Sequence, residues 1–137
     1  LNPNSEITYN KYGSPQLSDG KQISISHSKT FIAIIVSEKN VGIDIEEISE
    51  KALRIASKFI NKNNLLNLTN EKATLIWCVK ECIFKLFRKG NIDFKNDIKI
   101  ETFDTKEKGK LNCNFKGEKI IVNYRKIDNQ YLAYVCN

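Results

Sequence analysis

The sequence predicts an α+β domain in which two main helices pack on an antiparallel sheet. Three observations support this fold class: short runs of Ile and Val that indicate strands, two stretches with helical spacing, and a hairpin signal near the C-terminal end. The order of strands, helices and again strands is typical of helices packed on one antiparallel sheet. A chain of 137 residues with 41% hydrophobic residues is long enough to bury a modest core.

The first part of the chain combines a turn-rich start with three strand-like runs. Residues 1–20 are polar and contain the turn signals Gly-Ser-Pro and Ser-Asp-Gly. Residues 22–26, 30–37 and 41–46 contain the Ile- and Val-rich runs that favour extended backbone. We therefore predict strands over these three ranges.

Two helices are predicted in the middle of the chain. Ser49 is a suitable N-cap for a first helix that extends to about residue 62, because its hydroxyl can accept a hydrogen bond from the first turn. The apolar stripe of this helix consists of Ala52, Leu53, Ala56, Phe59 and Ile60. After a loop-like stretch, a second helix is predicted from Asn70 to Phe87, ending before Gly90.

The last third of the chain is predicted to form four strands. They cover residues 97–103, 110–115, 119–125 and 130–136, and the first of them alternates between polar and apolar side chains. The tripeptide Lys-Gly-Glu at 116–118 lies between the second and third of these strands and indicates a hairpin turn. Short turns of this kind join antiparallel neighbours, so these strands extend the predicted sheet.

The charge balance narrows the class of partner. The formal net charge is +6, which favours an acidic partner such as nucleic acid, an anionic membrane or an acidic protein. The lysines are spread along the chain, so the charge by itself favours solvated lysines on the surface of a soluble protein. The sequence has no aromatic-rich RNA-binding strand and no apolar run near the roughly 20 residues of a membrane span. We therefore predict no nucleic-acid partner and no membrane partner.

The cysteines and the first residues bear on the cellular compartment. Cys78, Cys82, Cys113 and Cys136 do not follow a metal-binding spacing, and the chain has one histidine. Buried, reduced thiols of a cytosolic protein are the expected state. The first residues show neither the basic start nor the apolar run of a secretory signal. We predict a cytoplasmic protein.

Two short motifs carry groups with chemical potential. In the strand-like run Val41–Glu47, Asp44 and Glu46 are two residues apart, so they project from one face roughly 6.5–7 Å apart. On the second predicted helix, Glu81 and Lys85 are four residues apart and are neighbours on one face. Taken singly, the patterns also fit a solvated strand face and a surface ion pair. Together, three carboxylates and several lysines suit a divalent cation and a phosphate-bearing substrate.

These residues match known sequence signatures. Gly-Ile-Asp-Ile-Glu at 42–46 and Trp-x-x-Lys-Glu-x-x-x-Lys at 77–85 resemble the signature of the 4′-phosphopantetheinyl transferase superfamily. Ser-His-Ser at 26–28 is similar to an element of the larger, surfactin-synthetase-activating type, so the chain is closer to that type than to the small holo-acyl-carrier-protein synthase type. The resemblance implies the α+β fold of this superfamily.

The resemblance implies an enzyme that moves 4′-phosphopantetheine from coenzyme A to a serine of an acyl or peptidyl carrier protein. Asp44, Glu46 and Glu81 are then the ligands of a Mg²⁺ cofactor. Glu81 is the catalytic base for the serine hydroxyl, and Lys85 is the catalytic residue that acts on the departing 3′,5′-ADP. Carrier proteins of this kind are acidic, which is compatible with the net charge of +6.

The resemblance also implies residues that bind coenzyme A. Ser26 and His27 are expected to contact a phosphate of coenzyme A, although a lone histidine beside strands is often structural. Lys80 and Lys85 are expected to bind phosphate as well, with support of the fold as the alternative role of Lys80. Trp77 is expected to be a packing residue rather than a substrate contact.

The chain also departs from the family pattern in two respects. The larger members consist of two similar halves, so residues 1–40 are predicted to be the end of a first half-domain and residues 41–137 the catalytic domain. The sequence contains no Met, which indicates missing N-terminal sequence. Residues 1–40 are too few for a full first half and too many for the small type, so we expect either a truncated chain or a chain that pairs with copies of itself. A family-like domain that binds coenzyme A but transfers poorly is the alternative function. Ser14 stands where the family places the lysine of Gly-Lys-Pro, which contacts a phosphate.

Overall fold

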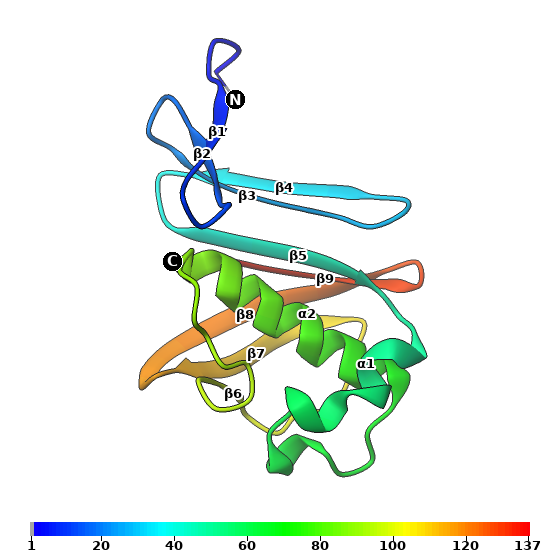
Figure 1. The fold of residues 1–137 in the computed structure, drawn as a ribbon. Helices are drawn as coiled ribbons and strands as arrows, with labels where there is room; N and C mark the ends of the chain where they lie inside the picture. The colour runs from blue at the N-terminus through cyan, green and yellow to red at the C-terminus, as the bar shows by residue number, and fades with distance from the viewer. Residues whose placement is uncertain (1) are drawn as a thin grey trace.

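A computed structural model describes residues 2–137 and has the predicted α+β architecture (Figure 1). Its three antiparallel sheets are the hairpin β1-β2, the hairpin β3-β4 and a five-stranded sheet in the order β5-β9-β8-β7-β6. The elements are β1 (Ile7–Tyr9), β2 (Pro15–Leu17), β3 (Gln22–His27), β4 (Ile32–Ser37), β5 (Val41–Glu47), α1 (Glu50–Arg54), two 3₁₀ turns (Ala56–Lys58 and Lys62–Asn64), α2 (Asn70–Phe87), β6 (Ile98–Ile100), β7 (Lys108–Phe115), β8 (Glu118–Ile127) and β9 (Gln130–Cys136).

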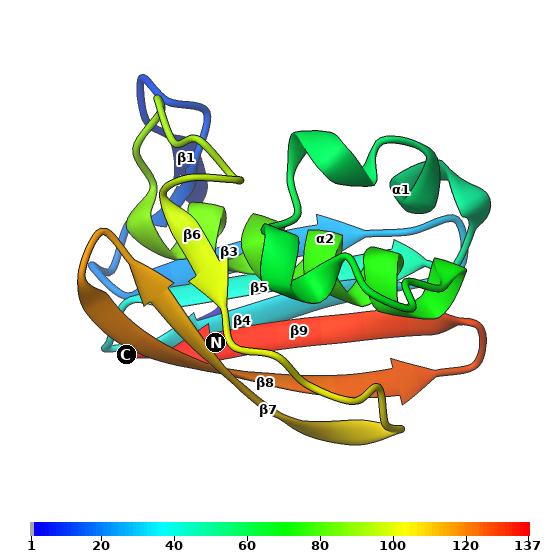
Figure 2. The ribbon, with the colours of Figure 1, turned by 90° about the horizontal axis from the view of Figure 1, so that it is seen from below.

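Helix α2 covers one face of the five-stranded sheet and buries most of its apolar side chains there. Figure 2 shows α1 and the turns that follow it beside α2, on the same side of the sheet. The hydroxyl of Thr69 accepts a hydrogen bond from the Lys72 N–H and begins the helix. Gly42 on β5 lets the helix approach closely, because a Cβ there would overlap the carbonyl of Cys82. The side chains on this part of β5 therefore lie directly under α2.

The first predicted helix is shorter than expected. Ser49 is its N-cap as predicted, because its hydroxyl accepts from the Lys51 N–H, but α1 ends at Arg54 and 3₁₀ turns replace the rest of the helix predicted to residue 62. Phe59 and Ile60 are buried in the core, while the Phe59 carbonyl accepts a hydrogen bond of 2.7 Å from Lys80. This carbonyl accepts its hydrogen bond from a side chain of α2 and not from a backbone N–H of its own segment. The prediction of a regular helix to residue 62 was therefore wrong.

The C-terminal strands follow the prediction except at the first one. The strand predicted over 97–103 is limited to β6, because the amides of Asn63 and Asn64 bind the Ile100 carbonyl at its end. Lys116 and Gly117 form the predicted hairpin turn, both with positive φ, of 49° and 91°.

Residues 2–40 form two hairpins beside the larger sheet. The turns predicted in the first twenty residues are present, but β1 and β2 were not predicted, because two strands of three mostly exposed residues leave no hydrophobic pattern. On β3, the hydroxyls of Ser24 and Ser26 accept hydrogen bonds of 3.0 and 3.1 Å from the Ile43 and Ile45 N–H groups of β5. Serine side chains therefore accept the hydrogen bonds of backbone N–H groups on the edge of β5 that does not pair with β9. The assignment of this segment to a first half-domain stays a prediction.

Three of the four cysteines are buried. Cys78, Cys82 and Cys113 are buried free thiols as predicted, whereas Cys136 is exposed at the end of β9. Within residues 2–137, no helix has both the length and the apolar character needed to cross a membrane.

Candidate functional site

Asp44 is the centre of the predicted site and is buried between β5 and α2, with only 3% of its surface exposed. Its Oδ1 accepts hydrogen bonds from the Ser26 hydroxyl at 3.0 Å and from the Lys85 ammonium at 2.9 Å. Its Oδ2 is equally buried and has no hydrogen-bond partner in the described chain. A buried carboxylate oxygen without a partner is costly, so this atom marks a place where a cation or a ligand donor would stabilise the fold.

Glu46 and Glu81 bring two further carboxylates to the same region. Burial first, and then the charges of Asp44 and Glu81, raise the pKa of Glu46 to about 8. Burial and Asp44 raise the pKa of Glu81 to about 7, whereas Lys85 lowers it. The three carboxylates do not converge on one point: in residues 2–137 no group of three acidic, histidine or cysteine side chains is arranged as a ready-made metal site. The raised pKa values mean that Glu46 is mostly protonated at neutral pH, because Lys85 cannot compensate the charge of three ionised carboxylates.

Lys85 comes from the last turn of α2 and reaches across to the hairpin. Besides Asp44, its ammonium donates to the Ile25 carbonyl of β3 at 3.3 Å. The sequence predicted Glu81 as its helical neighbour, and in the structure the ion pair is made with Asp44 instead. The side chain keeps 28% of its surface exposed and lines the pocket at the end of α2, so a ligand in that pocket can reach it.

Ser26 and His27 occupy different positions relative to this cluster. Ser26 is buried, and its single hydroxyl proton is donated to Asp44, so its placement favours orienting that carboxylate over the predicted contact with coenzyme A. His27 is exposed at the end of β3 and lines a shallow pocket together with Glu46 and Lys51. His27 therefore lies on the accessible side of the carboxylates.

Lys80 does not belong to the site. Its side chain is fully buried, and its ammonium donates to the carbonyls of Phe59, Phe94 and Ile98 at 2.6–2.7 Å and to the Asn61 Oδ1 at 3.2 Å. Burial lowers its pKa to about 8. All three N–H groups are engaged, so the placement of Lys80 favours the alternative role in the fold over the predicted phosphate contact.

Trp77 has the packing role that the sequence predicted. Its ring centroid lies 5.1 Å from that of Phe59 and 5.4 Å from that of Phe94. The backbone carbonyls of these same two residues accept hydrogen bonds from Lys80, so Trp77 and Lys80 together stabilise the same part of the core.

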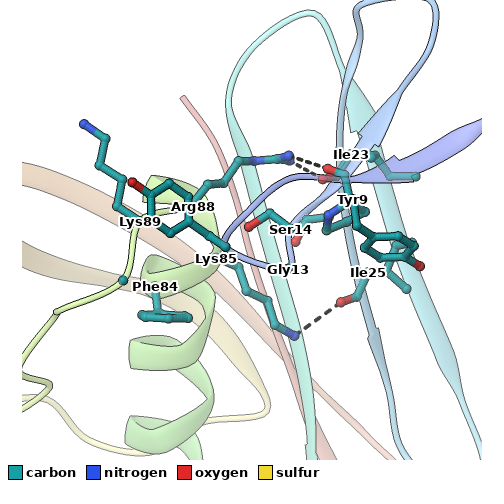
Figure 3. Close-up of a pocket in the computed structure, with 13 residues that line it drawn as sticks. Tyr9, Gly13, Ser14, Ile23, Ile25, Phe84, Lys85, Arg88 and Lys89 are labelled. Atoms are coloured by element: carbon teal, nitrogen blue, oxygen red, sulfur yellow. Dashed lines mark hydrogen bonds between the residues drawn. The ribbon is translucent and has the colours of Figure 1, made fainter.

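A pocket of about 380 Å³ lies at the C-terminal end of α2, next to Lys85 (Figure 3). Its walls come from the β1-β2 hairpin, β3 and the helix end, and they include Ser14, where the sequence comparison expected a phosphate-binding lysine. Tyr9, Tyr12 and Arg88 also line it, and sequence reasoning did not single them out. Arg88 gave no sequence signal, because its carbonyl partners belong to residues distant in the chain.

Comparisons with known proteins agree with the sequence signatures. A family model described as the 4′-phosphopantetheinyl transferase superfamily matches residues 40–136, which include both motifs. A 4′-phosphopantetheinyl transferase, gsp, from Aneurinibacillus migulanus is 33% identical over 97 residues, which are 64% of this chain and 41% of the relative. The 4′-phosphopantetheinyl transferase psf-1 from Bacillus pumilus is 34% identical over 74 residues, covering 49% of this chain and 32% of the relative.

The matches bear on the predicted family. The resemblance to this superfamily, and to its larger type in particular, is confirmed. The matched segment spans less than half the length of either relative.

Proposed function

We propose that this chain, which belongs to the 4′-phosphopantetheinyl transferase superfamily, transfers 4′-phosphopantetheine from coenzyme A to a serine hydroxyl of an acyl or peptidyl carrier protein. The observation that carries the proposal is the buried Asp44, which has one oxygen paired with Lys85 and the other without a partner, beside two carboxylates of raised pKa. Such a group of charges is suited to an anionic ligand that arrives together with a cation.

Asp44, Glu46 and Glu81 are the residues that would hold Mg²⁺. The unpartnered Oδ2 of Asp44 fits this role, because a carboxylate oxygen is the ligand that Mg²⁺ prefers. The raised pKa values of Glu46 and Glu81 fit it as well, since a divalent cation would supply the positive charge that the cluster lacks. When bound, the ion neutralises negative charge on the pyrophosphate of coenzyme A.

The residues of the chain itself supply the proton transfer and the leaving-group contact. The carrier serine oxygen forms a bond to the phosphorus next to pantetheine, and the bond from that phosphorus to the 3′,5′-ADP oxygen breaks. Glu81, with a pKa of about 7, accepts the serine proton near neutral pH. Lys85 faces the negative charge that develops on the departing 3′,5′-ADP.

The pockets on either side of Lys85 and Glu46 supply room for coenzyme A. The pocket near Ser14, of about 380 Å³, is lined by Lys85, and the other pocket, of about 570 Å³, is lined by His27 and Glu46. We assign the phosphates of coenzyme A to the region between them. The net charge of +6 is compatible with an acidic carrier protein, and the cytoplasm is the compartment where we place the reaction.

Mass spectrometry of a carrier protein tests the proposal. After incubation with the chain, coenzyme A and Mg²⁺, the carrier should gain about 340 Da, the mass of one phosphopantetheine group. The Asp44→Ala variant should give no gain while circular dichroism shows an intact fold. The chain matches less than half of its relatives, which favours binding without efficient transfer as the second candidate. Calorimetric binding of coenzyme A with no mass gain by any carrier tested would support that candidate.

A further inference from the structure

Arg88 ends helix α2 in an unusual backbone conformation. Its φ is +56°, in the left-handed region that glycine adopts far more readily than any residue with a side chain, and its N–H donates to the Phe84 carbonyl at 3.2 Å. The helix could end here with a glycine at lower conformational cost. The presence of arginine at this position indicates that its side chain makes contacts that offset the cost.

Those contacts join the helix end to two distant strands. One Nη of Arg88 donates to the Pro15 carbonyl of β2 at 2.7 Å, and the other Nη donates to the Ile23 carbonyl of β3 (Figure 3). These two hydrogen bonds, here called the Arg88 bridge, connect residues that are 73 and 65 positions apart in the sequence. The fork of the guanidinium makes both contacts at once, which a single ammonium does less well.

The Arg88 bridge leaves the charge of the guanidinium without a counter-ion. Both acceptors are neutral carbonyls, and across residues 2–137 no carboxylate forms an ion pair with Arg88. Its Nε is buried and has no partner in that range either. In Figure 3 the guanidinium of Arg88 points toward Ile23 and the hairpin, whereas the ammonium of the neighbouring Lys89 points away.

The hairpin that Arg88 holds has little other attachment to the rest of the chain. The three residues of β1 are exposed, and of β2 only Leu17 is buried. The other hydrogen bonds of the hairpin loop, from Asn10 to Ser14, stay within the loop itself. The Arg88 bridge is therefore the polar link between the loop that carries Ser14 and the helix that carries Lys85.

We propose that Arg88 is a positioning residue for coenzyme A: the Arg88 bridge holds the β1-β2 hairpin against the end of α2 and so keeps the pocket next to Lys85 in the shape that receives the ligand. This inference rests on the proposed function for the identity of the ligand. It does not require Arg88 to touch the reacting atoms. Arg88 acts through the wall of the pocket, so it contributes to ligand affinity rather than to the chemical step.

Two variants separate the bridge from the charge. Arg88→Gly removes the side chain and relieves the left-handed backbone, and Arg88→Lys keeps the charge without the fork. We expect both variants to raise the KM for coenzyme A by about five- to twentyfold with kcat changed less than about twofold, because Lys85 stays bonded to Asp44 and Ile25. If Arg88→Lys restores the KM while Arg88→Gly does not, charge alone matters and the bridge is overturned.

Hydrogen–deuterium exchange tests the bridge without any ligand. In Arg88→Gly, the amides of the hairpin, such as those of Asn10 and Gly13, should exchange faster by about tenfold, while amides of β5 and β9 are unchanged. Unchanged exchange in the hairpin would refute the bridge. If the wild-type chain binds no coenzyme A, the proposed function fails, yet the exchange result still decides the role of Arg88.

Lys116→Gly is the matched control. Lys116 also has a positive φ, 49°, and is exposed at the β7-β8 turn, away from the pocket. The substitution removes the same charge and introduces the same glycine. We expect wild-type KM and wild-type exchange in the β1-β2 hairpin. A loss equal to that of Arg88→Gly would show that net charge, rather than the bridge, governs affinity.

Discussion

Two lysines on α2, only five residues apart, show how differently this molecule uses the same side chain. Lys80 is enclosed by carbonyl oxygens in the core, and Lys85 pairs with Asp44 at the edge of a pocket. Both belong to the motif that identifies the family. The comparison shows that a motif lysine acquires its role from the face of the helix on which it lies. The ammonium of Lys80 has all of its hydrogen bonds within the core. The Asp44 carboxylate beside Lys85 keeps one oxygen that a ligand could contact.

The largest expected effect is on the stability of the core region. Lys80→Ala removes the donor from three buried carbonyls and leaves a cavity, so it should lower the free energy of unfolding by about 3–5 kcal/mol. Urea unfolding followed by circular dichroism measures this loss. The same substitution at Lys85 should cost less, about 1–2 kcal/mol, because that side chain is partly solvated and water can replace the ammonium beside Asp44. Similar losses for both variants would remove the contrast between the two lysines.

The second-largest expected effect is on catalysis and concerns Lys85. Lys85→Ala should lower the rate of transfer by about a hundredfold or more and weaken coenzyme A binding much less, if its ammonium stabilises the leaving group in the transition state. Single-turnover kinetics and calorimetry on the same preparation give the two quantities. Parallel losses in rate and affinity would reduce Lys85 to a binding residue.

The surplus negative charge of the site predicts a pH-dependent stability. Glu46 has a pKa of about 8 in the folded chain and an ordinary value of 4.5 when unfolded, so the folded state holds the proton more tightly. Its contribution to stability is fully present below about pH 4.5 and is lost as the pH rises toward 8. After discounting for solvent exposure, Glu46→Gln should stabilise the chain by about 1–2 kcal/mol at pH 8 with EDTA present.

Thermal unfolding from pH 5 to 9, with and without Mg²⁺, measures this effect. The stability difference between Glu46→Gln and the wild type should shrink when Mg²⁺ is added, because the ion compensates the wild-type charge. An equal response of the variant and the wild type to Mg²⁺ would contradict the assignment of Glu46 as a ligand.

The smallest effect concerns Ser14, the position where the pocket carries a hydroxyl in place of a charge. Ser14→Lys should tighten coenzyme A binding by up to about tenfold and leave 3′-dephospho-coenzyme A nearly unchanged, because only the former carries the additional phosphate. Titration of both ligands into both proteins provides the measurement. The same gain for the two ligands would place Ser14 away from the 3′-phosphate.

The sequence could predict which side chains share a face within each motif, because the spacing along one strand or one helix is local. The ion pair between Asp44 and Lys85 could not be predicted from either motif alone, because it depends on how β5 packs against α2. The role of Lys80 could also have been reached, since five residues on a helix correspond to a rotation of about 140° away from Lys85. Arg88 could not be identified, because its acceptors are carbonyls that only the tertiary fold brings near.

The first helix shows the same limit on a larger scale. Its cap at Ser49 is a local property and was predicted correctly. Its early end follows from the burial of Phe59 and from the carbonyl contact with Lys80, neither of which propensity or periodicity describes.

The serine contacts between β3 and β5 have a consequence for protein engineering. The register of β5 is set by its backbone pairing with β9, whereas the hydroxyls of Ser24 and Ser26 on β3 accept hydrogen bonds from the backbone of β5. Because β3 and β5 belong to different sheets, they share no ladder of backbone hydrogen bonds whose register a change in β3 could shift. We therefore expect that the β3-β4 hairpin can be replaced by a related hairpin that keeps the two serines without moving the strand that carries Asp44.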